Sequence, residues 1–296
     1  MLKMEFFEVL KVILLGIVEG ITEWLPISST GHMKLLNALP FMKLKGVSVG
    51  FMDMFEYVIQ LAAIFAVVIL FWKSIFPITK ETNETESKLV LDKEVLSLWV
   101  KVIIACVPAL LALGVDILFE KLCSLDPLIE PLLIACTLIL YGIVFIVVEN
   151  RNKDRQPTVT ECSQLSYKYA FLIGCFQLLA AIPGTSRSGI TIIGALLLGT
   201  NRTTASKFTF ILAIPTMVGA SAYKLLKFFL EAGTMSGAEA GYLLIGGAVA
   251  FAVSLVAIKF LMNFVKRHDF KVFGWYRIAL GCVVIAALVI PSLIFV

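Results

Sequence analysis

The chain has 296 residues, of which 59% are hydrophobic, and its formal net charge is +4. A soluble domain is usually about 45–50% apolar, so this composition and a mean hydropathy of +0.96 predict an integral membrane protein. The small net charge argues against a nucleic-acid partner. The bilayer is therefore the first partner that the sequence indicates.

The first apolar stretch, residues 5–38, is interrupted in its middle by proline, serine, threonine and glycine. Backbone groups without hydrogen-bond partners cannot face lipid, so such a break must be buried in protein or line a wet cavity. We therefore expect two half-helices joined by an irregular turn. They form a re-entrant hairpin, which enters and leaves the membrane on the same side.

Uninterrupted apolar stretches follow. A spanning helix needs about 20 mostly apolar residues, and the next three candidates are 52–72, 98–118 and 131–149. A second interrupted stretch, 168–199, contains AIPGTSRSGIT and predicts a second re-entrant hairpin. Three further candidate spans are 205–227, 240–262 and 275–295.

The two interrupted stretches align with each other, after a slip of one residue. The matched pairs are Gly16 with Gly174, Glu19 with Gln177, Pro26 with Pro183 and Ser29 with Ser186. Each half, 1–150 and 151–296, is then one hairpin plus three spans. Three is an odd number of crossings, so the second hairpin enters from the opposite face. The sequence thus predicts an all-α membrane domain built as an inverted-topology repeat.

Basic residues divide unequally between the two faces that this topology defines. The richer side collects those of the connectors 73–95 and 150–168 and those near 202–207 and 266–271. The poorer side has Lys3 and those near 34–45, 121 and 224–227. The positive-inside rule places the richer side in the cytoplasm, and both termini then lie outside.

Ionisable side chains inside a membrane are costly and usually functional. Glu19 and Glu23 are four residues apart and share one helix face. Two neighbouring carboxylates suit either general acid–base chemistry or a divalent cation. His32, one of two histidines in the chain, follows the hydroxyls of Ser28, Ser29 and Thr30, which favours a functional role.

The second break has the composition of an oxyanion site. Gly184 and Gly189 allow backbone N–H groups to converge at the start of a half-helix, where an anion is favoured. Arg187 adds a planar fork that matches phosphate oxygens. The hydroxyl donors here are Ser186, Ser188 and Thr191. Broken helices and midplane charges are equally typical of a secondary transporter or a lipid flippase for an anionic substrate.

Two long motifs carry a resemblance to a known family. EGITEWLPISSTGH (19–32) together with PGTSRSGIT (183–191) resembles the undecaprenyl-diphosphate phosphatases of the bacitracin-resistance type. The resemblance covers nearly the whole chain, including LAIP (212–215) and QLAAIFAV (60–67).

The resemblance implies an enzyme that removes the terminal phosphate from a polyprenyl (C55) diphosphate. This reaction regenerates the lipid carrier of peptidoglycan synthesis and confers bacitracin resistance. A bacterial cell membrane, a site that opens to the outer face and a Mg²⁺ or Ca²⁺ ion held by Glu19 and Glu23 are implied with it. Chain-length preference and a homodimer are left open.

The expected site residues form two groups. The catalytic set is Glu19, Glu23, Ser29, His32 and Arg187. The phosphate-binding set is Ser28, Thr30, Gly184, Ser186, Arg187, Ser188 and Thr191. The nucleophile is Ser29, His32 or water, and we favour Ser29 assisted by His32. The hypothesis requires the two hairpins to meet, so that His32 and Arg187 line one cavity.

Overall fold

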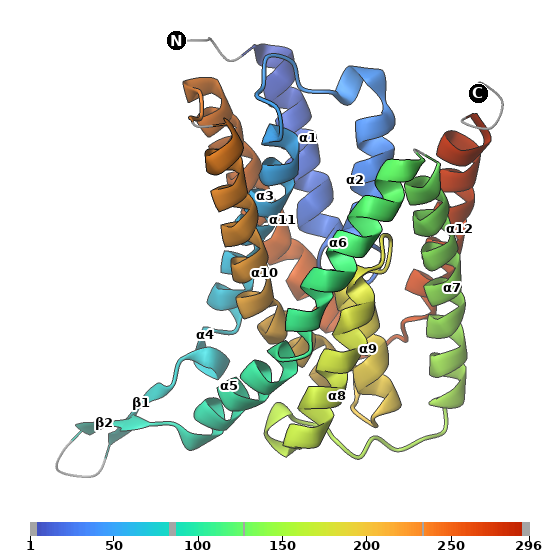
Figure 1. Ribbon diagram of the computed structural model, residues 1–296. Coiled ribbons are helices and arrows are strands. Elements are labelled where there is room, and N and C mark those ends of the chain that lie inside the picture. The colour runs from blue at the N-terminus through green and yellow to red at the C-terminus, as the bar shows by residue number, and fades with distance from the viewer. Residues whose placement is uncertain (1–4, 83–86, 127, 233, 292–296) are drawn as a thin grey trace.

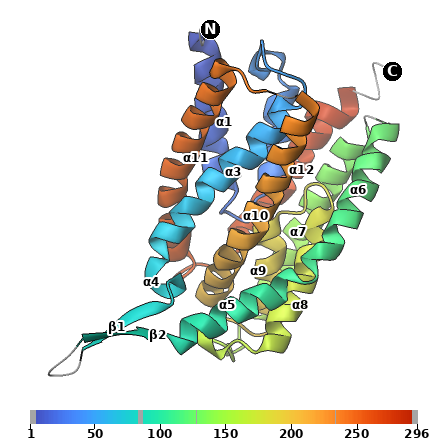
Figure 2. The ribbon, with the colours of Figure 1, turned by 60° about the vertical axis from the view of Figure 1, so that its left-hand side comes forward.

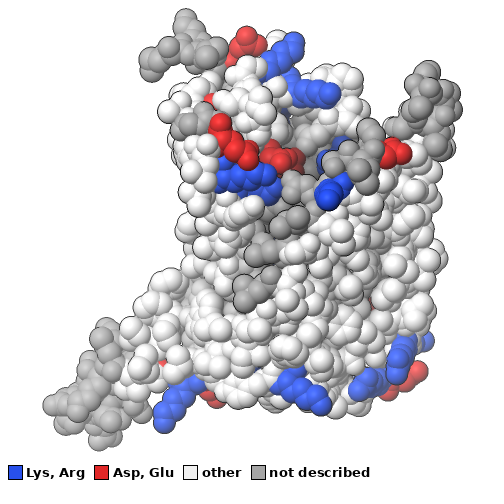
Figure 3. All heavy atoms as spheres, viewed as in Figure 1, with Lys and Arg blue, Asp and Glu red and all other residues white. Residues whose placement is uncertain are grey.

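The computed structural model describes residues 5–82, 87–126, 128–232 and 234–291. Its helices form a bundle, and both termini lie at one end (Figures 1 and 2). On the face seen in Figure 3, charged side chains gather at the two ends, and a broad uncharged band separates them. This distribution is the one expected for a protein whose middle lies in hydrocarbon.

The first half opens with a broken pair of helices, α1 (Phe6–Thr22) and α2 (Ser29–Ala38), followed by the 3₁₀ turn η1 (Pro40–Met42). The pair starts and ends at the end of the bundle that holds the termini (Figure 1). The elements after it are α3 (Phe51–Leu70), α4 (Trp72–Ile75), β1 (Ile78–Thr82), β2 (Ser87–Leu91), α5 (Lys93–Cys106), α6 (Ala109–Leu125) and α7 (Ile129–Arg151).

The second half opens with another broken pair, which starts and ends at the opposite end of the bundle (Figure 1). It comprises η2 (Cys162–Gln164), α8 (Tyr167–Leu178), η3 (Leu179–Ala181) and α9 (Arg187–Leu197). The elements after it are α10 (Arg202–Ala232), α11 (Gly237–Phe264) and α12 (Lys271–Val284), which runs on as a π-helical turn at Ile285–Val289. Both broken pairs confirm the predicted helix–break–helix pattern.

Among the described residues, five helices are long and apolar enough to cross a membrane, namely α3, α7, α10, α11 and α12. They confirm five of the six predicted spans and a multi-pass membrane protein. The prediction of one continuous helix over 98–118 is wrong, because the chain breaks at Pro108 into α5 and α6. Proline lacks the N–H that a continuous helix needs. The backbone of Ala105 also lies against Gly174 of α8 so closely that a Cβ at Gly174 would clash with it.

A short feature lies outside the all-α prediction. β1 and β2 pair antiparallel, with Ile78 opposite Leu91, and project from the end of the bundle opposite the termini (Figure 1). This hairpin falls in the polar connector after the first span. The connector's residues 83–86 lie outside the described part of the chain.

Helices of the first half pack against helices of the second. α3 packs on α10 and α7 on α12, while α1 packs on α11 and α8 on α5. α7 and α12 cross at two glycines. A Cβ at Gly142 would lie 2.7 Å from the carbonyl oxygen of Gly274, and a Cβ at Gly274 would lie 2.7 Å from that of Gly142. Small residues at such crossings let membrane helices approach closely.

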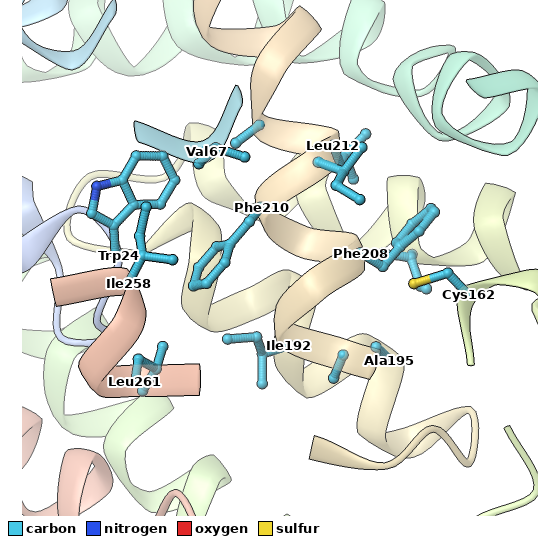
Figure 4. Close-up of a cluster of buried hydrophobic side chains, with 14 of the residues drawn as sticks. Trp24, Val67, Cys162, Ile192, Ala195, Phe208, Phe210, Leu212, Ile258 and Leu261 are labelled. Carbon is cyan, nitrogen blue, oxygen red and sulfur yellow. The ribbon is translucent and has the colours of Figure 1, made fainter. Parts of the chain in front are cut away.

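The largest apolar cluster fixes the position of the first break. Trp24, which follows α1, is buried against Phe210 of α10 in an edge-to-face contact with a ring-centroid distance of 5.3 Å (Figure 4). Ile192 and Ala195 of α9 belong to the same cluster. The same apolar cluster therefore packs against the first break and against the helix that follows the second break.

Candidate active site

The two breaks meet in the interior of the bundle. The Ser188 hydroxyl of α9 donates a hydrogen bond of 3.1 Å to the carbonyl oxygen of Glu23, which follows α1. The Arg187 guanidinium forms an ion pair with the Glu23 carboxylate. Contacts through both backbone and side chain thus bring the predicted acidic and basic motifs together.

The same serine cap begins the second helix of each pair. Ser28 caps α2 by accepting the Gly31 amide at 3.3 Å, and Ser186 caps α9 by accepting the Gly189 amide at 3.1 Å. The spacing S-x-x-G is shared because an N-cap hydroxyl satisfies an otherwise free amide in the first turn. Cap geometry therefore pairs Ser186 with Ser28, and the sequence alignment that paired it with Ser29 was wrong by one residue.

Glu23 is the centre of the polar cluster. One carboxylate oxygen binds Arg187, and the other accepts the Ser29 hydroxyl at 2.7 Å. Arg187 also donates to the Thr216 hydroxyl at 3.2 Å. A carboxylate at this distance from a hydroxyl can take its proton, so Ser29 has the partner that an activated nucleophile needs.

His32 faces away from this cluster. Its Nδ1 lies 2.7 Å from the Ser28 carbonyl oxygen and its Nε2 lies 2.7 Å from the Tyr276 hydroxyl. The ring borders a cavity of about 410 Å³, whose lining includes Tyr276 but neither Arg187 nor Ser29. The structure therefore places His32 one turn from Ser29, beside a cavity that Arg187 does not line, and this is a correction to the expectation of one common cavity.

Glu19 is fully buried, and neither of its carboxylate oxygens has a hydrogen-bond partner. Glu23, Glu56 and Gln60 surround it closely enough to interact with its charge. A buried carboxylate without a partner is costly and is therefore suited to a cation or a proton. The Glu19 carboxylate is therefore available as a ligand for the predicted cation, whereas the two oxygens of Glu23 already bind Arg187 and Ser29. The described residues contain no cluster of three or more metal-binding side chains.

The remaining predicted phosphate ligands divide between exposed and structural positions. Thr30 is exposed. Thr191 is buried and donates to the Arg187 carbonyl oxygen at 2.8 Å, so it supports α9. Ser186 and Ser188 lie with their hydroxyls 3.1 Å apart, beside Arg187. Gly184 has φ +83°, and a Cβ there would clash with Thr137.

Arg277 of α12 is a site residue that the sequence reasoning missed. It is fully buried and donates to the carbonyl oxygens of both breaks, to Pro26 at 3.4 Å and to Gly184 at 3.1 Å. Its guanidinium also lies over the Tyr141 ring, 5.9 Å from the centroid. The sequence feature that could have identified Arg277 is its position as an arginine inside the apolar stretch 275–295, because a charge within a membrane span is usually functional.

Comparisons with known proteins identify the family of this chain. The family model described as "Bacitracin resistance protein BacA" matches residues 12–283. The chain belongs to this family. A protein of Enterococcus faecalis named undecaprenyl-diphosphatase is 55% identical over 282 residues, which cover 95% of this chain and 98% of that protein. Proteins of the same name from Lachnoclostridium phytofermentans and Desulfitobacterium hafniense are 53% and 52% identical, each over 95% of this chain and over 97% and 96% of their own length.

The matched region contains both breaks and every site residue named above. Membership of the BacA family thus accounts for both long motifs at once. It also covers α12, which carries Tyr276 and Arg277.

Proposed function

We propose that this BacA-family protein hydrolyses undecaprenyl diphosphate to undecaprenyl phosphate and phosphate. It thereby recycles the lipid carrier of peptidoglycan synthesis and confers resistance to bacitracin. The names of its relatives support this reaction over roughly the full length of the chain. The observation that carries the proposal is the Ser29–Glu23–Arg187 cluster, which joins a hydroxyl, a base and a phosphate-binding cation.

In the proposed mechanism, the terminal phosphoryl group takes the place of Glu23 beside Arg187. Placement and charge neutralisation are most of what phosphoryl transfer requires. Ser29 Oγ attacks phosphorus, its proton passes to Glu23, and the bond from phosphorus to the bridging oxygen breaks. Undecaprenyl phosphate leaves, and water then hydrolyses the phosphoserine. The phosphate cradle consists of Ser186, Ser188 and Arg187, while Ser28, Gly184 and Thr191 hold the backbone around it.

We propose two alternative roles for His32, each of which requires its ring to leave Tyr276 and turn toward Ser29 and Arg187. In the first role, His32 assists the reaction of Ser29 from the next turn of α2. In the second, His32 itself attacks phosphorus. Direct attack by water is the alternative to both nucleophiles. Each role needs the lone pair on Nε2, which in this structure meets the Tyr276 hydroxyl.

A divalent cation, Mg²⁺ or Ca²⁺, is proposed at Glu19, with Glu23 as a second ligand once substrate binds Arg187. The free carboxylate of Glu19 supports this position. Such an ion would neutralise charge on the diphosphate.

We propose an inverted-topology repeat of residues 1–150 and 151–296. Support comes from the two broken pairs, which enter from opposite ends (Figure 1), and from the reciprocal contact of Gly142 and Gly274. The matched packing of α1 on α11 and of α8 on α5 points the same way.

We also propose that the site opens to the outer face of the cell membrane, where both termini lie. Polar side chains lead from Glu19 toward this end, since Glu56 accepts from Asn37 at 2.7 Å. The opposite side of the site is filled by α9, whose residues from Ser188 to Leu196 are buried. The richer set of basic residues lies at that far end, as expected for the cytoplasmic side.

One assay separates this function from a transporter built on the same fold. Purified protein in detergent is given C55 diphosphate and Mg²⁺, and released phosphate is measured. Substitution Arg187→Ala or His32→Ala abolishes release, whereas both variants still elute from gel filtration as folded protein. A transporter releases no phosphate, and full activity in both variants contradicts the assigned site.

Ser29→Ala distinguishes the nucleophiles. If Ser29 is the nucleophile, the variant releases no phosphate, and the phosphoserine that rapid acid quench traps in the wild type is absent. If water attacks directly, the variant still releases phosphate.

A further inference from the structure

The basic nitrogen of His32 has a partner in this structure. A backbone carbonyl can only accept a hydrogen bond, so the contact with Ser28 places the proton of the neutral ring on Nδ1. Nε2 is then the acceptor, and the Tyr276 hydroxyl donates to it at 2.7 Å. The two rings stack with an interplanar angle of 10°. The lone pair that the proposed mechanism needs is therefore occupied.

Tyr276 also belongs to the wall of the cavity that His32 borders. The other side chains of this cavity are mostly apolar and come from the end of α1, the first break and the start of α12: Val18, Ile21, Thr22, Leu25, Ile27, Val272 and Phe273. The Thr22 hydroxyl donates to the Val18 carbonyl within its own helix. The polar groups offered to a ligand are thus those of His32 and Tyr276, at one point of an apolar groove.

The groove lies at the lipid-facing surface. Ile21 is 39% exposed, Tyr276 45% and Val272 51%; Ile21 lies near the end of α1, and Val272 and Tyr276 lie in the first two turns of α12. A cavity of about 410 Å³ is of the size that holds a small-molecule ligand. It can therefore take the part of a long lipid chain next to its head group, while the remainder stays in the bilayer.

From these observations we infer that this groove binds the isoprene units next to the diphosphate, and that Tyr276 is a positioning residue that keeps His32 occupied until they enter. The chain displaces the phenol ring, the hydrogen bond to Nε2 breaks, and His32 becomes free to act on the phosphoryl group. The inference rests on the proposed role of His32. The groove is continuous with His32, and the family's substrate is a membrane lipid, so the isoprenoid chain is the occupant that both facts favour.

Such a gate predicts that the enzyme hydrolyses soluble diphosphates slowly. A diphosphate without a long chain can reach Arg187, but it leaves the groove empty and His32 bound to Tyr276. Hydrolysis is then coupled to the presence of lipid and not to the phosphate alone.

The test compares two substrates in detergent, C55 diphosphate and a C5 prenyl diphosphate. For wild type, kcat/KM is far higher for C55. Tyr276→Phe keeps the ring and removes the donor, so the ratio of the two kcat/KM values falls about tenfold, a change that one hydrogen bond of ordinary strength can produce. The change lies in kcat for the C5 substrate, because Tyr276 does not hold the phosphate.

A second pair of variants tests the groove itself. Val272 and Val283 both lie on α12, and each is 51% exposed, but Val272 lines this groove and Val283 lines a separate cavity beside α2. Val272→Trp raises KM for C55 diphosphate about tenfold, while Val283→Trp leaves it unchanged. Equal effects of the two substitutions overturn the groove assignment.

The outcomes separate the gate from the proposed function. An unchanged C55-to-C5 ratio in Tyr276→Phe, or an equal loss with both substrates, overturns the gate even when His32→Ala abolishes release. Full phosphate release by His32→Ala instead overturns the role proposed for His32, whatever Tyr276→Phe does.

Discussion

The broken pairs α1–α2 and α8–α9 share one backbone plan and carry opposite chemistry. Each second helix begins at a serine cap with glycine three residues later. The first pair supplies Glu19, Glu23 and His32, and the second supplies Arg187 with its hydroxyl neighbours. A repeated backbone thus places an acidic and a basic half opposite each other, and Glu23 and Arg187 meet where the halves touch.

The pairs also differ in their surroundings. α9 is buried from Ser188 to Leu196, whereas α1 exposes one side, with Leu10, Leu14, Ile17 and Ile21 on it. The helix that begins at Arg187 is therefore enclosed by protein, although Phe171 of α8 and Leu179 of η3 are exposed, and the first helix of the acidic half lies next to lipid. This difference suggests that the phosphate is bound by the rigid pair and that the lipid approaches along the exposed one.

The largest effect is expected at the basic half. Arg187→Lys keeps the charge and loses the planar fork, so kcat falls about a thousandfold, the lower range for an arginine that stabilises phosphoryl transfer. Arg202→Lys is the matched control, since Arg202 binds Glu149 at the far end of the bundle through Nε at 3.0 Å and Nη2 at 2.6 Å. Phosphate release measures both. Equal losses of activity in the two variants would show that the guanidinium fork of Arg187 contributes to folding and does not bind the phosphate.

In the acidic half, Glu19→Gln should lower activity and raise stability. Removing a buried carboxylate that has no partner relieves its desolvation cost, so the thermal midpoint in detergent rises. Activity falls about a hundredfold if Glu19 handles a proton or a cation. The concentration of Mg²⁺ that gives half-maximal release increases if it is a cation ligand. A variant with unchanged activity would make Glu19 a structural residue.

The crossing of α7 and α12 tests whether the two halves are equivalent. Gly142→Ala and Gly274→Ala each force a Cβ against a carbonyl oxygen 2.7 Å away, so each lowers the unfolding free energy by about 1–3 kcal/mol. Gly219→Ala is the control, since nothing lies within 4 Å of a Cβ there. Thermal unfolding in detergent measures all three. Unequal losses at Gly142 and Gly274 would argue against a twofold relation.

The smallest effect concerns the two caps. Ser28 has φ +75°, a conformation that favours glycine, whereas Ser186 has φ −47°. Ser28→Gly therefore raises the free energy of unfolding by about 0.5–1 kcal/mol, even after the loss of the cap is subtracted. Ser186→Gly lowers the free energy of unfolding by a few tenths of a kcal/mol. Calorimetry of the two variants checks the opposite signs. A loss at both positions would mean that Ser28 is not strained.

The sequence predicted both broken pairs because proline, glycine and hydroxyls cluster inside apolar stretches, where only a buried break is tolerable. A single proline gives no such signal. Pro215 lies inside α10 without ending it, whereas Pro108 separates α5 from α6. Close approach of Gly174 to the broken segment distinguishes the second case, and that contact is tertiary.

The site was predictable where motifs are dense and not where single residues reach it from distant helices. Glu23, Ser29 and Arg187 were placed in one catalytic set, and the structure brings them into contact. Tyr276, Arg277 and Glu56 lie on α12 and α3, and their roles depend on which spans pack beside the breaks. The direction of the His32 ring could not be predicted either, because a competing partner on α12 sets it.

The burial of α9 has a consequence for the fate of the products. Because α9 is buried from Ser188 to Leu196, the proposed opening on the other side of the site is the path by which both the lipid head group enters and the freed phosphate leaves. The proposed hydrolysis then moves no solute across the bilayer, and turnover leaves the permeability barrier of the membrane intact.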